Sequence, residues 1–313
     1  MKWVTYRHGA GSPERIGLVV GSEIHGLEEG LSLLEVLCDD QTVEAAARAS
    51  STPIEVVAIS DVQLLSPLPQ PPSIRDFMAF EAHITNALKA SGLTVDPSWY
   101  DHPCFYFSNP AAVYGPDTTV PISPGSLTYD FELEIAAVIG REGRDLLPSE
   151  ASDYIAGYTI LCDWSARDIQ RAEVPLRLGP AKGKDGATSL GPMLITPDEL
   201  AYARTERGYD LTLEAFVNGV PYSRGNWSDI HWSFEQMIAY ASRGTRVVPG
   251  DVFGSGTVGT GCLVELRQLH DPEDYPWLTP GDEVEFRIEG LGSLRSRVGV
   301  ANSVPTVAEL LRS

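Results

Sequence analysis

The sequence has few cysteines and no long apolar run. The four cysteines, Cys38, Cys104, Cys162 and Cys262, lie far apart and form no CxxC pair. Neither a disulfide scaffold nor a zinc ribbon is therefore expected, and a reducing cytoplasm is the default location. No apolar run reaches the roughly 18 residues of a membrane span. The first ten residues also lack the apolar core of a signal peptide, so no membrane or secretory route is expected.

Basic residues are also scarce. The chain has 43 acidic and 23 basic residues, which gives a formal charge of −20 at pH 7. Such a field repels nucleic acid and anionic membranes, so neither is expected as a partner. Hydrophobic residues make up 43% of the 313 residues, so the chain can bury a full core in one or two domains.

The first 69 residues are predicted to form a small, β-rich N-terminal accessory domain. Residues 4–6 and 16–20 are β-type runs, and residues 32–38 and 43–49 have the composition of short helices. Four prolines then occur within residues 65–72. Because proline fixes φ and removes a donor, this segment should be an extended connection. We place the boundary there, which leaves residues 70–313 as a second domain.

The second domain is predicted to be rich in strands. Strands are expected at 131–139 and 158–162, and a hairpin at 211–217 and 220–223 around Asn218-Gly219. Helices are expected at 74–90, 149–157 and 233–242. The pattern predicts a β-dominated α+β fold.

One glycine-rich segment imitates a nucleotide-binding motif. Residues 254–259 match GxGxxG, but a dinucleotide site needs a helix directly after the glycines. Residues 262–266 are instead predicted to form a strand, which argues against such a site. The chain also lacks the GxSxG and HExxH motifs of common hydrolases and zinc proteases.

Acidic residues are embedded in apolar sequence at two places. Glu132 and Glu134 are two residues apart in a predicted strand, so their side chains point to the same face and would repel unless a cation neutralised them. A solvated strand face is the alternative. Asp163 ends the next predicted strand, and Arg167 and Gln170 follow at spacings of one helical turn. For Arg167 alone, a structural ion pair is the simpler explanation.

Four sequence blocks together resemble the fumarylacetoacetate hydrolase superfamily. They are DFELEIAAVIG (130–140), DWSARDIQ (163–170), GKDGATSLGP (183–192) and GSGTVGTG (254–261), in the family's order. The resemblance covers nearly all of the chain after the proline segment, and the first 69 residues are similar to the accessory domain of longer members. It implies a mixed β-sandwich roll for the second domain.

The resemblance implies a metal site and a general base. Asp76, Glu132, Glu134 and Asp163 match the family's ligands for one divalent cation. These hard oxygen ligands suit magnesium or manganese, with calcium possible. His83 lies seven residues after Asp76, as in members that cleave fumarylacetoacetate, and Glu265 matches its carboxylate partner. For His83 alone, a surface histidine is the alternative. Shorter members that cleave acylpyruvates use a His–Glu pair on a lid, which leaves a role for Glu81 open.

The resemblance also implies contacts to the substrate. The matching residues are Tyr106, Arg167, Gln170, Lys184 and Thr257. Of these, Lys184 is also a candidate catalytic residue, since with Arg167 it would supply positive charge to a developing enolate. One position departs from the family, because Val174 stands where the cleaving enzyme has an aromatic hydroxyl. An apolar pocket wall and a different distal end of the substrate are therefore expected.

The resulting hypothesis is metal-dependent hydrolysis of a carbon–carbon bond in a 2,4-diketo acid. His83, held by Glu265, would activate the water. Two alternatives stay open: decarboxylation or isomerisation of a 2-oxo acid such as oxaloacetate with the same metal site, and a non-catalytic metabolite-binding protein. By resemblance alone, a homodimer acting on a small keto acid is expected.

Overall fold

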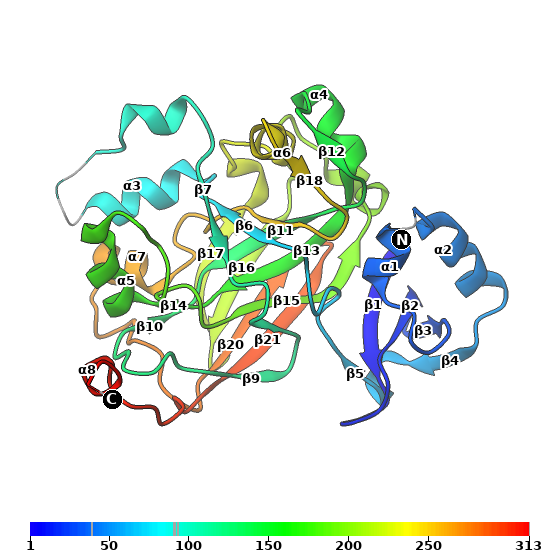
Figure 1. Cartoon of the computed structure of the whole chain (residues 1–313), viewed down its shortest axis with the longest axis horizontal. Coiled ribbons are helices and arrows are strands. Elements are labelled where there is room, and N and C mark those ends of the chain that lie inside the picture. Colours follow the sequence, from blue (N-terminus) through cyan, green and yellow to red (C-terminus); the bar gives the residue numbers. More distant parts are fainter. Residues whose placement is uncertain (39, 90–91, 93, 313) are drawn as a thin grey trace.

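The computed structural model describes residues 1–38, 40–89, 92 and 94–312. Two sheets dominate the molecule, and the predicted β-dominated α+β fold is confirmed (Figure 1). Within these residues, no helix has both the length and the apolar character needed to cross a membrane.

The larger sheet has the strand order β4-β3-β2-β1-β15-β13-β11-β19-β6-β7, with β5 paired to β1 and β8 paired to β15. Its strands are β1 (Lys2–Arg7), β2 (Arg15–Val20), β3 (Glu23–Gly26), β4 (Glu55–Ala58), β5 (Gln63–Leu64), β6 (Ile74–Phe77), β7 (Phe105–Ser108), β8 (Val113–Tyr114), β11 (Leu133–Ile139), β13 (Ile155–Asp163), β15 (Thr188–Ile195) and β19 (Val252–Gly254).

The second sheet has the order β17-β16-β20-β21-β9. Its strands are β9 (Thr118–Pro121), β16 (Thr212–Val217), β17 (Val220–Asn226), β20 (Glu283–Ile288) and β21 (Gly292–Gly299). Two short pairs join β10 (Tyr129–Asp130) to β14 (Ser165–Ala166) and β12 (Gly143–Arg144) to β18 (Arg246–Val247). The α-helices are α1 (Leu33–Cys38), α2 (Thr42–Ser51), α3 (Glu81–Lys89), α4 (Pro148–Ala151), α5 (Arg167–Glu173), α6 (Phe234–Ser242), α7 (Leu263–Leu269) and α8 (Val307–Leu310).

Strand β11 is buried on both faces, which explains its continuous apolar run. Its odd-numbered residues belong to a core shared with the inward-facing residues of β16 and β20. Ala136 and Val138 belong instead to a core shared with the N-terminal segment. Since strand side chains alternate, Glu132 and Glu134 lie on the same face as Ala136. They are located past the end of the second core.

The N-terminal segment extends the larger sheet. Strand β1 pairs antiparallel with β15, with Trp3 opposite Leu194. The elements β1–β4, α1 and α2 lie together at one side of the molecule in Figure 1 (blue). The helices α1 and α2 agree with the predictions for 32–38 and 43–49 to within two residues. The domain boundary near residue 69 stays a prediction.

The hairpin prediction is confirmed. Strands β16 and β17 pair antiparallel around Asn218 and Gly219, whose φ angles are 51° and 77°. Two successive positive φ angles define the turn that asparagine followed by glycine favours. The helix predicted at 233–242 is also present as α6, with Ser233 as its N-cap.

The helix predicted at 74–90 was wrong in its first part. Residues 74–77 form β6, all four of them buried between β19 and β7, and α3 begins only at Glu81. A buried strand followed by an amphipathic helix happened to produce helical apolar spacing across the junction. Residue 90 lies outside the described residues.

The helix predicted at 149–157 was too long. It comprises α4 and a 3-10 turn (Ser152–Tyr154), and β13 starts at Ile155. Gly157 lies within β13, where an added Cβ would stand 2.6 Å from the Ile195 carbonyl oxygen. The close approach of β15 thus requires glycine inside the strand.

The strand predicted at 262–266 was also wrong, because helix α7 begins at Leu263. Its first turn is held by a buried carboxylate from another part of the chain. Asp130 Oδ1 accepts from Leu263 N at 2.7 Å, and its Oδ2 accepts from Val264 N at 3.1 Å. This tertiary contact satisfies helix-start donors that the local apolar sequence leaves open.

Candidate metal centre and adjoining base pair

Four carboxylates converge at one end of strands β6, β11 and β13. The residues are Asp76, Glu132, Glu134 and Asp163, all buried, and one oxygen from each lies within 4.8 Å of the others. Glycine makes room for them, since a Cβ at Gly254 would stand 2.5 Å from Asp76 Oδ1. The sequence pattern had placed Glu132 and Glu134 on one face, and the structure brings Asp76 and Asp163 to the same point.

The carboxylate oxygens of this acidic cluster are only partly satisfied. Asp76 Oδ1, Glu134 Oε1 and Asp163 Oδ1 are buried and accept no hydrogen bond from the residues that the structure describes. Buried polar atoms are normally paired, because an unpaired one keeps its full desolvation cost. Unpaired oxygens from three of four converging carboxylates fit a hard divalent cation, for which oxygen is the preferred ligand.

Two cationic side chains adjoin the acidic cluster. Lys184 Nζ lies 2.5 Å from both Glu132 Oε2 and Asp163 Oδ2, and Arg167 Nη2 lies 2.7 Å from Glu132 Oε1. Burial raises the pKa of Glu132, but Lys184 and Arg167 outweigh it and hold the pKa below its usual range. Glu132 is therefore the carboxylate that stays ionised most easily.

The pKa values of the other three carboxyl groups are raised above their ordinary values. Burial and the neighbouring Asp76 and Glu132 charges raise the pKa of Glu134 well above its ordinary value. Burial also raises the pKa of Asp76, and it raises the pKa of Asp163 to about 8 against the partly opposing effect of Lys184. Without a bound cation, part of the acidic cluster thus retains protons at neutral pH.

These shifts predict that metal stabilises the protein more as pH rises. In the metal-free fold, Glu134, Asp76 and Asp163 bind protons that the unfolded chain has released, so stability falls with rising pH. For Asp163 the loss extends from its ordinary value of 3.8 to about 8. We expect the gain in melting temperature on adding Mg²⁺ to EDTA-treated protein to be larger at about pH 9 than at about pH 6. A gain that shrinks over this interval would contradict the prediction.

A histidine and a glutamate form a hydrogen-bonded pair beside the acidic cluster. His83 Nδ1 lies 2.5 Å from Glu265 Oε1, and the imidazole is close enough to Glu132 to interact with it electrostatically. Asn86 Nδ2 and Thr260 N each donate to Glu265 Oε2 at 2.9 Å. Because His83 lies on α3 and Glu265 on α7, the packing of these two helices determines the distance between the two side chains. The sequence predicted both partners, whereas it did not single out Asn86, one helical turn after His83.

Asp130 connects this pair to the acidic cluster. It is fully buried and holds the first turn of α7, the helix that carries Glu265. Its Oδ2 also accepts from Arg167 Nε at 2.8 Å, and Arg167 in turn contacts Glu132. Sequence reasoning missed Asp130, although an aspartate directly before a buried apolar strand was a usable signal.

Replacing Asp130 with asparagine is expected to destabilise the fold. The change removes one of the two buried carboxylates that pair with Arg167 and one acceptor for the α7 backbone, which should cost about 3 kcal/mol of unfolding free energy. Urea denaturation would measure it. Asp117→Asn, which breaks the exposed ion pair with Arg295, is the matched control and should cost under about 1 kcal/mol. Equal losses in both variants would contradict the special position of Asp130.

The predicted substrate contacts fall into two groups. The Tyr106 hydroxyl lies 2.9 Å from Asp76 Oδ2 and also contacts Asp163, so its one proton can go to either carboxylate. Tyr106 and Lys184 thus touch the acidic cluster directly. Gln170 Oε1 accepts from Arg167 Nη1 at 3.1 Å, and Thr257 is buried in the loop between β19 and α7. Arg167 is thus engaged with protein groups, consistent with the structural ion pair that its sequence context allowed.

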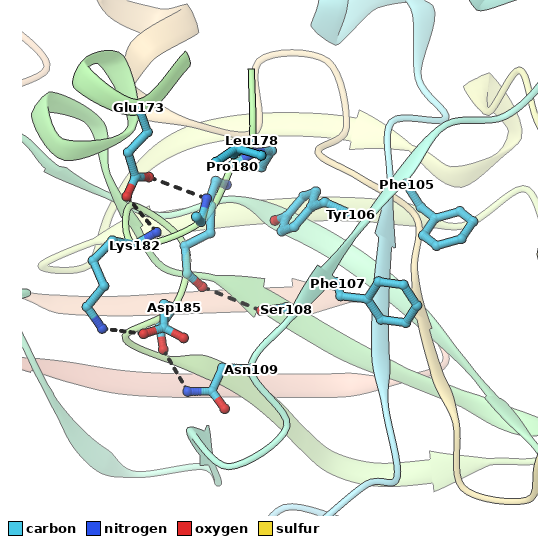
Figure 2. Close-up of a pocket in the computed structure, with 13 residues that line it drawn as sticks. Phe105, Tyr106, Phe107, Ser108, Asn109, Glu173, Leu178, Pro180, Lys182 and Asp185 are labelled. Atoms are coloured by element: carbon cyan, nitrogen blue, oxygen red, sulfur yellow. Dashed lines mark hydrogen bonds and ion pairs between the residues drawn. The ribbon is translucent and has the colours of Figure 1, made fainter. Parts of the chain in front are cut away.

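A cavity of about 700 Å³ leads to Tyr106 and Lys184. It lies between β7 and the loop of residues 178–185 (Figure 2). In Figure 2 the Tyr106 ring points toward this loop, whereas the Phe105 and Phe107 rings point to the other side of β7. The Glu173 carboxylate fixes the loop by accepting from the backbone nitrogens of Ala181, Lys182 and Gly183 at 2.8–3.3 Å.

One expectation about a neighbouring residue needs correction. Val174 was expected to form an apolar pocket wall, but it is 59% exposed and does not line this cavity. The wall at this side is formed by Leu178, Gly179 and Pro180. Glu81, whose role was left open, accepts a hydrogen bond from the Tyr100 hydroxyl at the surface.

The glycine-rich segment at 254–259 packs against the acidic cluster and does not form a nucleotide site. A helix does follow it, contrary to expectation, but Asp130 already occupies the backbone donors at the start of α7. Gly256, with φ of 76°, passes so close to β6 that a Cβ would stand 2.3 Å from the Phe77 carbonyl oxygen. The occupied helix start, and not a missing helix, is therefore what speaks against a dinucleotide site.

Comparison with known proteins identifies relatives of this arrangement. Mitochondrial oxaloacetate tautomerase from Homo sapiens is 28% identical over 260 residues, which cover 83% of this chain and 76% of the relative. The structure of a fumarylacetoacetate hydrolase from Exiguobacterium antarcticum matches with a TM-score of 0.74 and 26% identity, over 96% of this chain and 99% of the other.

A third match shares the fold at lower identity. Maleylpyruvate hydrolase from a Sphingobium species, solved with manganese(II) and pyruvate, has a TM-score of 0.70 and 21% identity over 96% of this chain and all of its own. Residues 73–299, which contain all four carboxylates and the His–Glu pair, match the family described as fumarylacetoacetate (FAA) hydrolase C-terminal. The chain therefore belongs to the fumarylacetoacetate hydrolase family, whose members include hydrolases and an oxaloacetate tautomerase.

Proposed function

We propose that the protein hydrolyses a carbon–carbon bond in a 2,4-diketo acid with the help of a divalent cation. The observation that carries the proposal is the pairing of His83 with a buried Glu265 directly beside the acidic cluster. A base of this kind is what the attack of water on a carbonyl requires.

Asp76, Glu132, Glu134 and Asp163 would hold one cation, Mg²⁺ or Mn²⁺, with Ca²⁺ also compatible. When bound, the cation would supply Lewis acidity toward the substrate carbonyl oxygens. The Sphingobium maleylpyruvate hydrolase, whose structure holds manganese(II) together with pyruvate, supports this choice of cofactor.

The other catalytic roles would belong to residues of this chain. His83 directs Nδ1 to Glu265, so its Nε2 is the nitrogen free to take a proton from water. The resulting hydroxide adds to the carbonyl carbon, the carbon–carbon bond breaks, and its electron pair becomes an enolate that a proton then quenches. Lys184, buried beside Asp163, would place positive charge next to the developing enolate oxygen. Arg167 would act mainly by holding Glu132 in place.

Isomerisation or decarboxylation of a 2-oxo acid is the second candidate. The similarity to an oxaloacetate tautomerase over 83% of the chain favours it. A decarboxylase releases carbon dioxide and needs no attacking water, so loss of His83 and Glu265 should spare decarboxylation more than hydrolysis. A tautomerase moves a proton between carbon and oxygen and would still need a base.

The proposed assembly comes from the family resemblance, and the proposed location comes from the scattered cysteines. We propose a cytoplasmic homodimer that acts on a small keto acid, and sedimentation equilibrium of the full chain would test the dimer. A non-catalytic metabolite-binding role would be favoured instead by tight ligand binding without turnover.

Loss of the enol absorbance of 1,3-diketones would test the reaction. The panel comprises acylpyruvates, fumarylpyruvate and fumarylacetoacetate, each with Mg²⁺, with Mn²⁺ and with EDTA. We expect metal-dependent loss for at least one compound, with a carboxylic acid and a ketone as products. No loss for any compound, together with conversion of oxaloacetate, would replace hydrolysis by the second candidate.

A further inference from the structure

A second group of possible metal ligands lies beside the acidic cluster and differs from it in chemistry. It consists of His83, Cys262 and Glu265, whose ligand atoms lie within 4.8 Å of one another. Glu265 Oε1 is central, 2.5 Å from His83 Nδ1 and 3.5 Å from Cys262 Sγ. We propose that these three residues bind a thiophilic divalent cation such as Zn²⁺, and that this binding switches off the general base.

The local structure brings the three side chains together. Cys262 is the residue before α7 and Glu265 is the third residue within it, a spacing of one turn that directs both to the same side. His83 faces them from α3. Asn86 and Thr260 fix the other oxygen of Glu265, so the group rests on two packed helices and a loop.

The ligand types separate this group from the acidic cluster. Nitrogen, sulfur and oxygen together are a typical zinc ligand set, whereas four carboxylates suit Mg²⁺ or Mn²⁺. Zinc binds sulfur at about 2.3 Å and nitrogen or oxygen at about 2.0–2.2 Å, so its ligands stand roughly 3–4 Å apart. Around the cation, His83 Nδ1 and Glu265 Oε1 would move apart from 2.5 Å to about 3 Å, whereas the 3.5 Å between Cys262 Sγ and Glu265 Oε1 already lies in this range.

Three protein ligands leave one position for water and a path by which a cation can arrive. The side chains of Cys262 and Glu265 are inaccessible to solvent, while that of His83 is 12% exposed. A cation would thus pass the imidazole and replace two protons, the one between His83 and Glu265 and the one on the Cys262 thiol. The fourth position would face the same opening.

The inhibitory effect rests on the proposed function and follows from the imidazole itself. A neutral imidazole has one N–H and one basic nitrogen. With a cation on Nδ1, the proton must sit on Nε2, and the nitrogen that would accept a proton from water is lost. Occupation of this group would stop hydrolysis without emptying the acidic cluster.

Cobalt(II) binding to the full-length protein in saturating Mg²⁺ would test the site. Mg²⁺ keeps the acidic cluster occupied, and a thiolate-to-cobalt charge-transfer band in the near ultraviolet reports sulfur ligation alone. We expect the band in the wild type and its loss in Cys262→Ser, with Cys262→Ala as a second variant should serine disturb folding. The double variant Cys38→Ser/Cys104→Ser, which removes the two exposed thiols, is the control and should keep the band.

Zinc titration of turnover then tests the regulatory role. One equivalent of Zn²⁺ should abolish wild-type turnover, and Cys262→Ser should need at least about 10-fold more zinc, since a lost ligand weakens binding. Absence of the cobalt band in the wild type, or its survival in Cys262→Ser, would overturn the site. Zinc binding with full turnover would overturn the inhibition. If no substrate is found, the cobalt band still decides the site independently of the proposed function.

Discussion

Replacing His83 with alanine is expected to lower kcat for diketo acid hydrolysis by about 10²–10⁴-fold, the usual contribution of a general base. The imidazole is the group of the His–Glu pair that would receive the proton of water, and alanine offers no substitute. Metal affinity should not change, because His83 contributes no atom to the acidic cluster. Initial rates and Mg²⁺ titration of the same preparation would measure both quantities.

Three further variants sharpen this test. Glu265→Gln keeps the shape of the pair but removes its charge, so it should impair kcat without emptying the metal site. The double variant with His83→Ala should be no slower than His83→Ala alone, because two residues that act as one unit are not additive. His102→Ala, which removes an exposed histidine stacked on Tyr240, is the control and should leave kcat unchanged. Loss of metal affinity in His83→Ala would contradict its assignment as base.

The acidic cluster could be predicted because its residues carry local signals. Two glutamates at a spacing of two in an apolar strand must share a face, and Asp163 marks the end of the neighbouring strand. The pairing of β11 with β13 then places Leu133 opposite Cys162, so these carboxylates meet. Asp76 was predicted only through family resemblance, since its helical context was misjudged.

The start of α7 could not be predicted from local sequence. Residues 262–266 form a short apolar run whose length and composition suit a strand as well as a helix. The helix is favoured by Asp130, whose carboxylate accepts hydrogen bonds from the first backbone donors of α7. Asp130 is 133 residues away from Leu263 in sequence. Hydrogen bonds between residues so far apart in the sequence cannot be predicted from a short window of neighbouring residues.

The expectation for Val174 rested on the family resemblance and was also wrong. The matching position in the cleaving enzyme suggested a pocket wall, yet Val174 lies in a 3-10 turn after α5 with its side chain exposed. The wall is built a few residues later, by the segment that Glu173 anchors through backbone hydrogen bonds. Which residues of a turn face a cavity depends on the path of the loop that follows, and backbone hydrogen bonds such as those to Glu173 determine that path.

Exchanging Glu134 for glutamine is expected to weaken divalent cation binding by about 100-fold or more, since even partners outside the ligand set usually contribute 10–100-fold. Glu134 is inaccessible to solvent, and its Oε1 has no hydrogen-bond partner among the described residues. Glutamine nearly matches its shape but lowers the charge available to a cation. Isothermal titration of metal-free protein with Mn²⁺ would measure the loss.

The same exchange should leave the metal-free fold intact, and this separates metal binding from folding. Burial already raises the pKa of Glu134 well above its ordinary value, so the metal-free fold favours a neutral side chain there. Because a group with a raised pKa costs stability as pH rises, the glutamine variant should be at least as stable as metal-free wild type at about pH 8.

A buried glutamate outside the acidic cluster provides the matched comparison. Glu235 accepts from Arg204 Nη2 at 2.6 Å, and its pKa is lowered because this partner and other hydrogen bonds outweigh its burial. Glu235→Gln should therefore lose folding stability and keep its Mn²⁺ affinity, the reverse of the result for Glu134→Gln. Unchanged Mn²⁺ affinity in Glu134→Gln would remove this residue from the ligand set. The cation would then have to rest on Asp76, Glu132 and Asp163, with Lys184 still beside two of them.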